Sequence, residues 1–204
     1  MRMTDAGWGY LCERAKPERR EFLQIYAKQY IEPLFASYPE LYGKVYLALR
    51  KKGFFAEYDP VLHIIVPERA LTAYTPFQLR SIAAHEMLHL VQFQNEVGKK
   101  SQSKKYEYQA TFLSWARGCA YDFVMSFPAS CKETACAFSN RHGYFSCGAI
   151  FSKCCRDCSE SELRALAKKL EGLSFRYTLS DLPDFEAVVR RELGTEKDEK
   201  EGNP

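Results

Sequence analysis

The chain has 204 residues, eight cysteines and a formal net charge of +3 at pH 7. Hydrophobic residues make up 46% and charged residues 27%, which is ordinary for a globular protein and excludes a wholly disordered, collagen-like or coiled-coil chain. The small net charge does not by itself indicate a nucleic-acid partner. No stretch approaches the ~20 apolar residues of a membrane span, and the N-terminus lacks a signal-peptide pattern, so we expect a cytoplasmic protein without a membrane partner.

The first third of the chain predicts a helix and three short strands. Apolar residues recur at helical spacing over residues 17–38, and Pro33 should bend or end that helix. Residues 45–49 and 54–58 flank a charged turn with a glycine, which predicts a β-hairpin. Residues 62–66 form a third apolar run, and the prolines at both of its ends favour an edge strand.

The rest of the chain is predicted to be mainly helical. Residues 75–94 begin with Thr-Pro-Phe-Gln, which is typical of a capping box with proline at the first helical position. After a loop, an apolar-rich helix is expected over residues 104–125. A second capping signature begins a helix over residues 159–170, and a last helix is expected over 183–193. Residues 194–204 are charged and lack apolar side chains, which predicts disorder.

The helix predicted over residues 75–94 contains His85-Glu86-Met87-Leu88-His89. Residues four apart share one face of a helix, so both imidazoles can bind one metal ion while Glu86 lies beside the water-binding side. These polar groups stand among apolar neighbours, where burial without a partner is costly, and zinc is such a partner. The alternative is a histidine pair that is hydrogen-bonded in a helix interface.

A third ligand is needed, because a catalytic zinc usually has three protein ligands and one water position. Glu107 is the first candidate, since an antiparallel return helix can bring it opposite the histidine pair. Otherwise it would be a solvated carboxylate that the helix dipole favours in a first turn. Glu96, two turns beyond His89, and His142 are the competing candidates.

These residues resemble the core of the zincin metallopeptidases of the gluzincin type, in which the third ligand is a glutamate on the helix after the active-site helix. The resemblance covers about residues 45–125 and includes Tyr106-Glu107-Tyr108-Gln109-Ala110. Minigluzincins and the ImmA/IrrE peptidases are the most similar groups, the latter through their Glu-x-x-Ala segment. A SprT-like layout is a weaker resemblance, because that family uses a third histidine soon after the pentapeptide.

The resemblance implies an α+β zincin-like fold, with a small, mostly antiparallel sheet packed on an active-site helix and a glutamate-bearing helix. It implies one catalytic Zn²⁺ held by His85, His89 and Glu107. Glu86 would act as the general base that takes a proton from zinc-activated water as the water attacks a peptide or protein substrate. The chain would then be a zinc metalloendopeptidase.

The resemblance also bears on the surroundings of the site. In zincins, an edge strand binds extended substrate by main-chain pairing, and the matching segment here is His63, Ile64 and Ile65. Thr111 occupies the position where larger gluzincins often have an aspartate that supports a zinc-bound histidine. Some carboxylate or carbonyl should nevertheless orient each imidazole.

Six of the cysteines lie between residues 131 and 158. In a reducing cytosol such crowding favours metal or redox chemistry over a disulfide framework. The best-spaced set for a second, structural zinc, or for disulfides, is Cys131, Cys136, Cys155 and Cys158. Basic and aromatic residues among them could contact nucleic acid, although a solvated charged surface is the simpler interpretation.

The expected organisation has four parts. A zincin-like catalytic domain with its N-terminal helix spans residues 1–127, a Cys-rich segment 128–158, C-terminal helices that pack on the core 159–193, and a disordered tail 194–204. The second hypothesis is a non-peptidase or SprT-like zinc protein whose Cys-rich segment binds DNA or a protein. The sequence carries no signal for substrate preference or oligomeric state.

Overall fold

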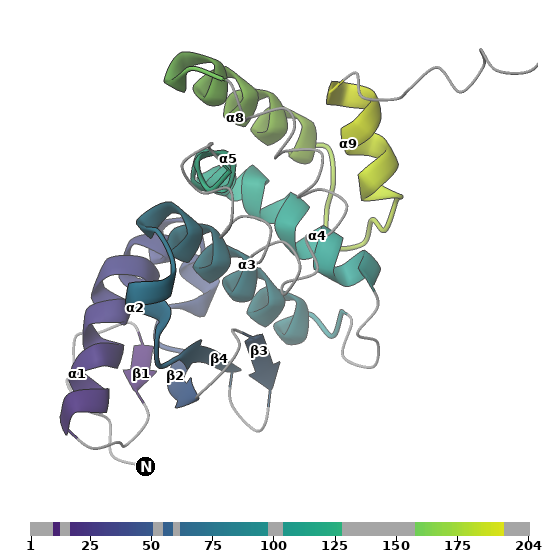
Figure 1. Cartoon of the computed structure of the whole chain (residues 1–204). Helices are drawn as coiled ribbons and strands as arrows, with labels where there is room; N and C mark the ends of the chain where they lie inside the picture. The colour runs from purple at the N-terminus through teal and green to yellow at the C-terminus, as the bar shows by residue number, and fades with distance from the viewer. Residues whose placement is uncertain are drawn as a thin grey trace, which may run out of the picture.

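The structure, a computed structural model, describes residues 10–12, 17–50, 55–58, 62–97, 104–127 and 158–193. Within these ranges the protein is a helix-rich α+β structure, with a small sheet on one side and helices covering it (Figure 1). The predicted disordered tail, residues 194–204, lies outside the described ranges. None of the described helices is both long and apolar enough to cross a bilayer.

The N-terminal helix changes its winding where the sequence predicts a break. It begins as α1 (Pro17–Tyr26), widens into the π-helical η1 (Ala27–Ile31) and tightens into the 3-10 helix η2 (Glu32–Ala36). Pro33 has no N–H to donate and cannot continue an α-helical ladder. The N–H of Glu32 instead bonds to the Ala27 carbonyl, five residues back. The predicted effect of Pro33 is therefore confirmed.

The sheet has four strands in the order β1-β2-β4-β3. These are β1 (Tyr10–Cys12), β2 (Val45–Arg50), β3 (Phe55–Tyr58) and β4 (Leu62–Pro67). The β1–β2 and β2–β4 pairs are parallel, and only β3–β4 is antiparallel among the described strands. The expectation of a mostly antiparallel sheet was therefore wrong.

The predicted hairpin over residues 45–58 was also wrong, because β2 pairs with β4 and not with β3. Leu47, Ala48 and Leu49 are consecutive and all buried, so both faces of β2 are covered. A continuous buried run is typical of a strand in a parallel sheet, whereas a hairpin with one solvated face alternates. The antiparallel pair of this sheet is formed by β3 and β4.

The expected edge strand over residues 62–66 is an interior strand. β4 pairs with β2 on one side and with β3 on the other, so its main-chain groups already have partners. His63, Ile64 and Ile65 therefore cannot bind a substrate by main-chain pairing. Pro67 stands at the last position of β4, where a missing N–H costs little. The open edge beside β4 belongs to β3.

The pentapeptide helix, α3 (Pro76–Gln94), follows the short α2 (Ala70–Ala73) and runs through the middle of the fold (Figure 1). Its predicted capping box is confirmed: the Thr75 hydroxyl accepts from the Gln78 N–H at 3.3 Å, and the Thr75 N–H donates to Gln78 Oε1 at 2.9 Å. Thirteen of its 19 residues are buried, because the sheet packs on one side and downstream helices on others. α3 is therefore a core helix.

The helix predicted over residues 104–125 is present but kinked. It consists of α4 (Lys104–Ser114), the π-helical η4 (Trp115–Cys119) and α5 (Ala120–Met125). The kink falls at Gly118, whose φ of 83° is a conformation that favours glycine.

The two predicted C-terminal helices are present as α8 (Glu160–Ser174) and α9 (Phe185–Leu193). α8 packs on α5 and η4, and α9 packs on α4. The first of them extends four residues beyond the predicted end at 170, because Leu173 and Ser174 are still buried against the core.

Candidate metal centre

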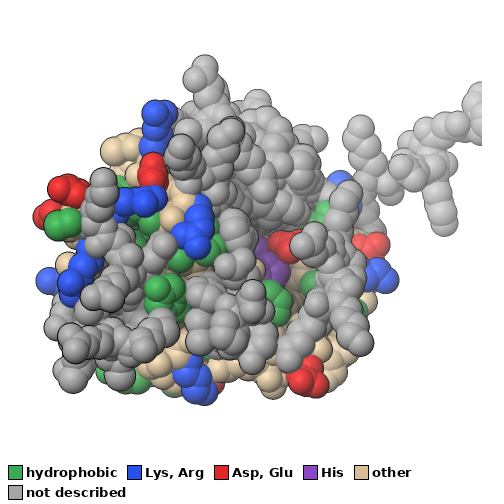
Figure 2. Space-filling view, turned by 90° about the horizontal axis from the view of Figure 1, so that it is seen from below, with side chains coloured by type: hydrophobic (Ala, Val, Ile, Leu, Met, Phe, Trp, Pro, Cys, Tyr) green, Lys and Arg blue, Asp and Glu red, His purple; other side chains and the backbone are tan. Residues whose placement is uncertain are grey.

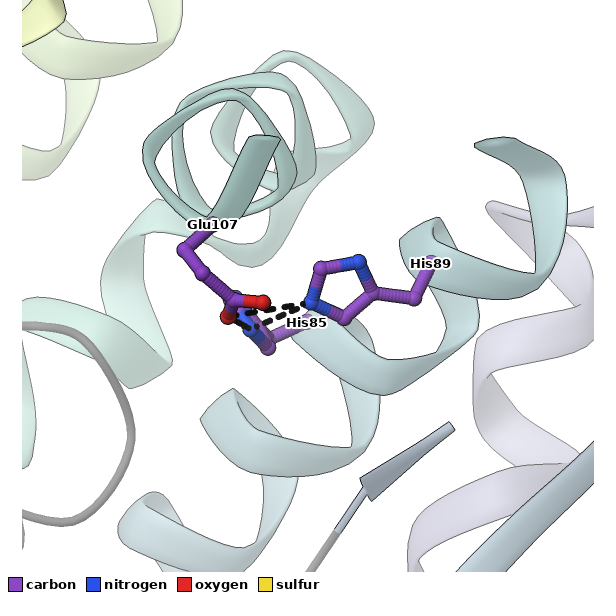
Figure 3. Close-up of side chains that lie close together, drawn as sticks. All are labelled: His85, His89 and Glu107. Carbon is purple, nitrogen blue, oxygen red and sulfur yellow. Dashed lines mark hydrogen bonds and ion pairs between the residues drawn. The ribbon is translucent and has the colours of Figure 1, made fainter. Parts of the chain in front are cut away.

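Three side chains from two helices meet at one point (Figure 3). His85 and His89 lie one turn apart on α3, and Glu107 projects from the first turn of α4. The two Nε2 atoms are 3.0 Å apart, and each lies 3.2 Å from Glu107 Oε2. Among the residues that the structure describes, this is the group of histidine, cysteine and carboxylate side chains that could hold a metal ion.

The spacing of the three donor atoms fits a zinc ion. Zinc bonds of about 2.0–2.1 Å in a regular tetrahedron put neighbouring donor atoms about 3.3–3.4 Å apart. The observed separations of 3.0 to 3.2 Å are close to that value. Two imidazole nitrogens and a carboxylate oxygen are also a donor set that zinc prefers. The residues present therefore fit the metal that the sequence predicts.

The outer nitrogen of His89 has a hydrogen-bond partner that fixes the state of the ring. His89 Nδ1 lies 2.7 Å from Gln92 Oε1. The Gln92 amide nitrogen donates to the Tyr106 carbonyl at 3.2 Å and to Gln109 Oε1 at 2.8 Å, so Gln92 Oε1 faces His89 as an acceptor. His89 Nδ1 must then carry the proton, and in the neutral ring Nε2 keeps its lone pair for a metal.

His85 is supported in a different way. Its Nδ1 lies 3.0 Å from the Thr111 hydroxyl, which is buried one turn beyond Glu107 on α4. Thr111 therefore occupies the supporting position that the sequence left unassigned. Both supporting residues stand at helical spacing from a ligand, Gln92 three residues after His89 and Thr111 four after Glu107. That spacing is the signal by which they could have been found.

The carboxylate and the imidazoles affect each other's protonation. Burial alone would lower the pKa of His89, but the hydrogen bond and charge of Glu107 raise it above its ordinary value. Burial works to raise the pKa of Glu107, yet the contacts with His85 and His89 hold it well below its usual range. The side-chain exposures are 3% for His85, 12% for His89 and 36% for Glu107, so the centre opens toward solvent on the glutamate side.

Figure 2, which views the molecule from below, shows a histidine side chain at the surface directly beside an acidic side chain. The exposed fractions of His89 and Glu107 likewise show that part of the group faces solvent.

Glu86 lies beside the three ligands and is only 3% exposed. One of its oxygens, Oε2, is buried without a hydrogen-bond partner among the described residues. The backbone of Ala56 in β3 lies near the same carboxylate and acts to lower its pKa. Burial raises the pKa of Glu86, and the charges of His85 and His89 counter this in part. A buried carboxylate with an unused oxygen is suited to accept a proton.

The other candidate residues are distributed differently. Glu96 follows the end of α3 with a φ of 60°, is exposed and does not belong to the group. His142 and three of the predicted cysteine ligands, Cys131, Cys136 and Cys155, lie outside the described residues.

Cys158 is described and packs, partly buried, against the core. The second metal site or disulfide at the cysteine cluster stays a prediction. No family model, no curated protein and no solved structure matches the chain, so a functional assignment depends on the geometry of this centre.

Proposed function

We propose that the chain is a zinc-dependent metallopeptidase with a zincin-like core, in which His85, His89 and Glu107 hold the metal. The observation that carries the proposal is the convergence of His85 Nε2, His89 Nε2 and Glu107 Oε2 within 3.2 Å of one another. A histidine interface that served packing alone would not need both Nε2 atoms and a carboxylate to face the same point. The outer nitrogens already have their own partners in Gln92 and Thr111.

The chemistry divides between the metal and the protein. A bound zinc ion supplies Lewis-acid chemistry, which lowers the pKa of water and polarises a carbonyl. Glu86 then acts as general base: its buried oxygen accepts the proton of the attacking water and returns it to the leaving nitrogen. Burial keeps the pKa of Glu86 above its ordinary value, nearer to neutral, where a group can both accept and release a proton.

The open edge of β3 is where we propose that an extended substrate binds. Ala56 of β3 pairs with Ile64 of β4, and its backbone lies close enough to the Glu86 carboxylate to lower the pKa of that group. α3 also packs on β3, so Glu86 lies close to this strand. A peptide that pairs with this edge would therefore pass directly beside Glu86, which brings its scissile carbonyl near the general base.

Cleavage by the zinc-loaded protein and by Glu86→Gln tests the proposal. The wild type should cut an unfolded protein such as casein, as followed by mass spectrometry, and Glu86→Gln should lose about 10²–10⁴-fold of that rate. The zinc content should stay the same in both. Glu96→Gln, at an exposed glutamate just past the same helix, is the matched control and should keep full activity. Equal rates for wild type and Glu86→Gln would exclude this mechanism.

The alternative of a non-peptidase or SprT-like zinc protein depends on the Cys-rich segment, most of which lies outside the described residues. No described contact favours a DNA or protein partner for that segment. Zinc binding in the wild type together with no cleavage of any peptide in a diverse library would favour this alternative.

A further inference from the structure

A continuous series of amide hydrogen bonds leads from His89 to the C-terminal part of the chain. His89 Nδ1 contacts Gln92 Oε1 at 2.7 Å, and the Gln92 amide donates to Gln109 Oε1 at 2.8 Å. The Gln109 amide donates in turn to two carbonyls, Leu179 O at 3.0 Å and Asp181 O at 2.7 Å. The series thus connects α3, α4 and the segment between α8 and α9.

The two carbonyls at the end of this series set the direction of every bond in it. A carbonyl can only accept, so the Gln109 nitrogen must face Leu179 and Asp181, and Gln109 Oε1 must face Gln92. The Gln92 nitrogen then faces Gln109, and Gln92 Oε1 faces His89. The Tyr106 carbonyl accepts from the same Gln92 nitrogen, so it and the main chain near residue 180 together determine which nitrogen of His89 carries the proton.

The segment that holds these carbonyls is itself fixed. The Asp181 carboxylate accepts from the Thr178 N–H at 2.7 Å and from the Thr178 hydroxyl at 2.8 Å. The Asp181 N–H donates to the Thr178 carbonyl at 3.1 Å. We call residues 178–181 the C-terminal turn. Its closed hydrogen bonding holds the two carbonyls where the Gln109 amide meets them.

Both glutamines are almost fully buried, with exposures of 2% for Gln92 and 0% for Gln109. Two apolar side chains of similar volume would fill the same space without needing partners, and buried amides are costly unless every group is bonded. Here both amide nitrogens have two acceptors each. Gln92 also bonds to the Tyr106 carbonyl, next to Glu107. It therefore orients His89 directly and stabilises the first turn of α4, which carries Glu107.

We infer that Gln92 and Gln109 are positioning residues of the metal centre, which transmit the placement of the C-terminal turn to His89 and so raise its affinity for zinc. The inference takes its metal from the proposed function. It adds a role for residues 178–181, which are far from the centre in sequence and touch none of its ligands. Partners of this kind behind a metal-bound histidine typically change metal affinity about 10- to 100-fold.

Zinc affinity, measured by competition with a chromophoric chelator on the full-length chain, tests the inference. Gln92→Leu should weaken binding about 10- to 100-fold, and Gln109→Leu should weaken it by a smaller factor. Gln92→Glu should weaken binding as well, because its carboxylate can accept from His89 Nδ1 but cannot donate to Gln109 or to the Tyr106 carbonyl. A role in packing alone predicts unchanged zinc affinity in both leucine variants, since leucine fills the volume.

Gln78→Leu is the matched control. Gln78 is a glutamine on the same helix and equally buried, but it belongs to the N-terminal capping box and touches no member of the series. Its replacement should lower the stability of the protein and leave zinc affinity unchanged. If Gln92→Leu and Gln109→Leu bind zinc as tightly as Gln78→Leu does, the inference is wrong.

A second measurement needs neither a variant nor zinc. Long-range ¹H–¹⁵N NMR of the metal-free wild type, under conditions where the imidazoles are neutral, reports which nitrogen of His89 is protonated. We expect the Nδ1–H form, and a dominant Nε2–H form would overturn the inference even if variants fail to fold. A wild type that shows the Nδ1–H form but binds no zinc would instead refute the proposed function.

Discussion

The two halves of α3 are joined to the downstream helices by polar groups of different kinds. In the N-terminal half, Arg80 forms an ion pair of 2.7 Å with Asp122 of α5, and its guanidinium lies over the Phe77 ring. In the C-terminal half, His85 and His89 meet Glu107 of α4. The ion pair balances its own charges. The second group directs three lone-pair donors at one point, which is favourable only around a proton or a cation.

The difference distinguishes a polar contact that only joins two helices from a group whose donor atoms are arranged so that they could bind a ligand. In the ion pair, burial raises the pKa of Asp122 and the Arg80 contact offsets part of that rise, so each charge has its partner within the fold. At the metal centre, partners behind the rings already satisfy the outer nitrogens, and the inner ones remain directed at the glutamate. Four experiments test this difference between the two halves of α3.

The largest expected difference is in zinc affinity. Glu107→Ala removes a ligand and should weaken zinc binding by more than the about 100-fold typical of an outer-shell partner. Asp122→Ala removes the carboxylate that pairs with Arg80 in the N-terminal half of α3, and it should leave zinc affinity unchanged. Chelator competition on both variants measures this. Comparable losses in the two would mean that the two halves of α3 do not differ in kind.

Zinc should stabilise the folded protein through the C-terminal half alone. At a free zinc concentration of 100 times Kd, the free energy of unfolding should rise by about 2.7 kcal/mol. The same increment is expected in Arg80→Met, because distant sites usually contribute additively. Chemical denaturation with and without zinc gives both values. An increment that survives in Glu107→Ala would place the bound metal elsewhere.

The pH dependence of the metal-free protein should report Glu86. A raised pKa means that the folded state binds more protons than the unfolded state above about pH 4.5, so stability should fall as pH rises from there. His89, whose pKa is also raised, adds a loss as pH rises through its folded value. Glu86→Gln should remove its share of the decline, at most about 1.4 kcal/mol per pH unit.

Urea denaturation of chelator-treated protein between about pH 5 and about pH 8 measures that slope. Glu18→Gln, at an exposed position of α1, is the control. If Glu86→Gln loses stability with pH as steeply as the wild type does, the burial of Glu86 is not what sets the slope.

The smallest effect is expected at the ion pair. Arg80 and Asp122 are 33% and 23% exposed, so Arg80→Met should cost about 1 kcal/mol of stability, near the upper end for surface pairs. The double variant Arg80→Met/Asp122→Leu should recover part of this, because no carboxylate is left unpaired. A double-mutant cycle in denaturant gives the coupling. A loss of stability several times larger would show that this ion pair behaves like a fully buried one.

The helices could be predicted because their signals are local. The capping residues of α3 act on neighbours within one turn, so its start at Pro76 and end at Gln94 agree with the sequence. The helix over 104–125 was predicted in extent, although its kink was not. The sequence alone does not indicate that Gly118 has a positive φ, because that conformation depends on the bend that the fold requires there.

The sheet could not be predicted in the same way, because strand pairing joins distant residues. The run 45–49 was assigned to its nearest neighbour in sequence, whereas β2 pairs with β1 and β4. Prolines beside residues 62–66 suggested an edge, yet Pro67 stands at the last position of β4, where a missing donor is tolerated. The error affected the expected substrate strand too, because that strand was placed at β4 whereas the open edge beside it belongs to β3.

The three candidate ligands were found from spacing, but their supports were not. His85 and His89 share a helix face, and a return helix brings Glu107 opposite, so local periodicity and one short connection are enough. The position of Thr111 was noted from the resemblance without a role, and Gln92 was missed, because a polar residue on an apolar helix face shows its role only once its partner is known.

The enclosure of α3 on nearly all sides determines where the protein can open. Its central amides should exchange with deuterium only when the whole domain unfolds, since local fraying cannot reach them. The histidines then stand on a helix that is buried along most of its length. If a protein substrate needs more space at this site, we expect the movement in the elements around α3. These are β3 at the edge of the sheet and the first turn of α4.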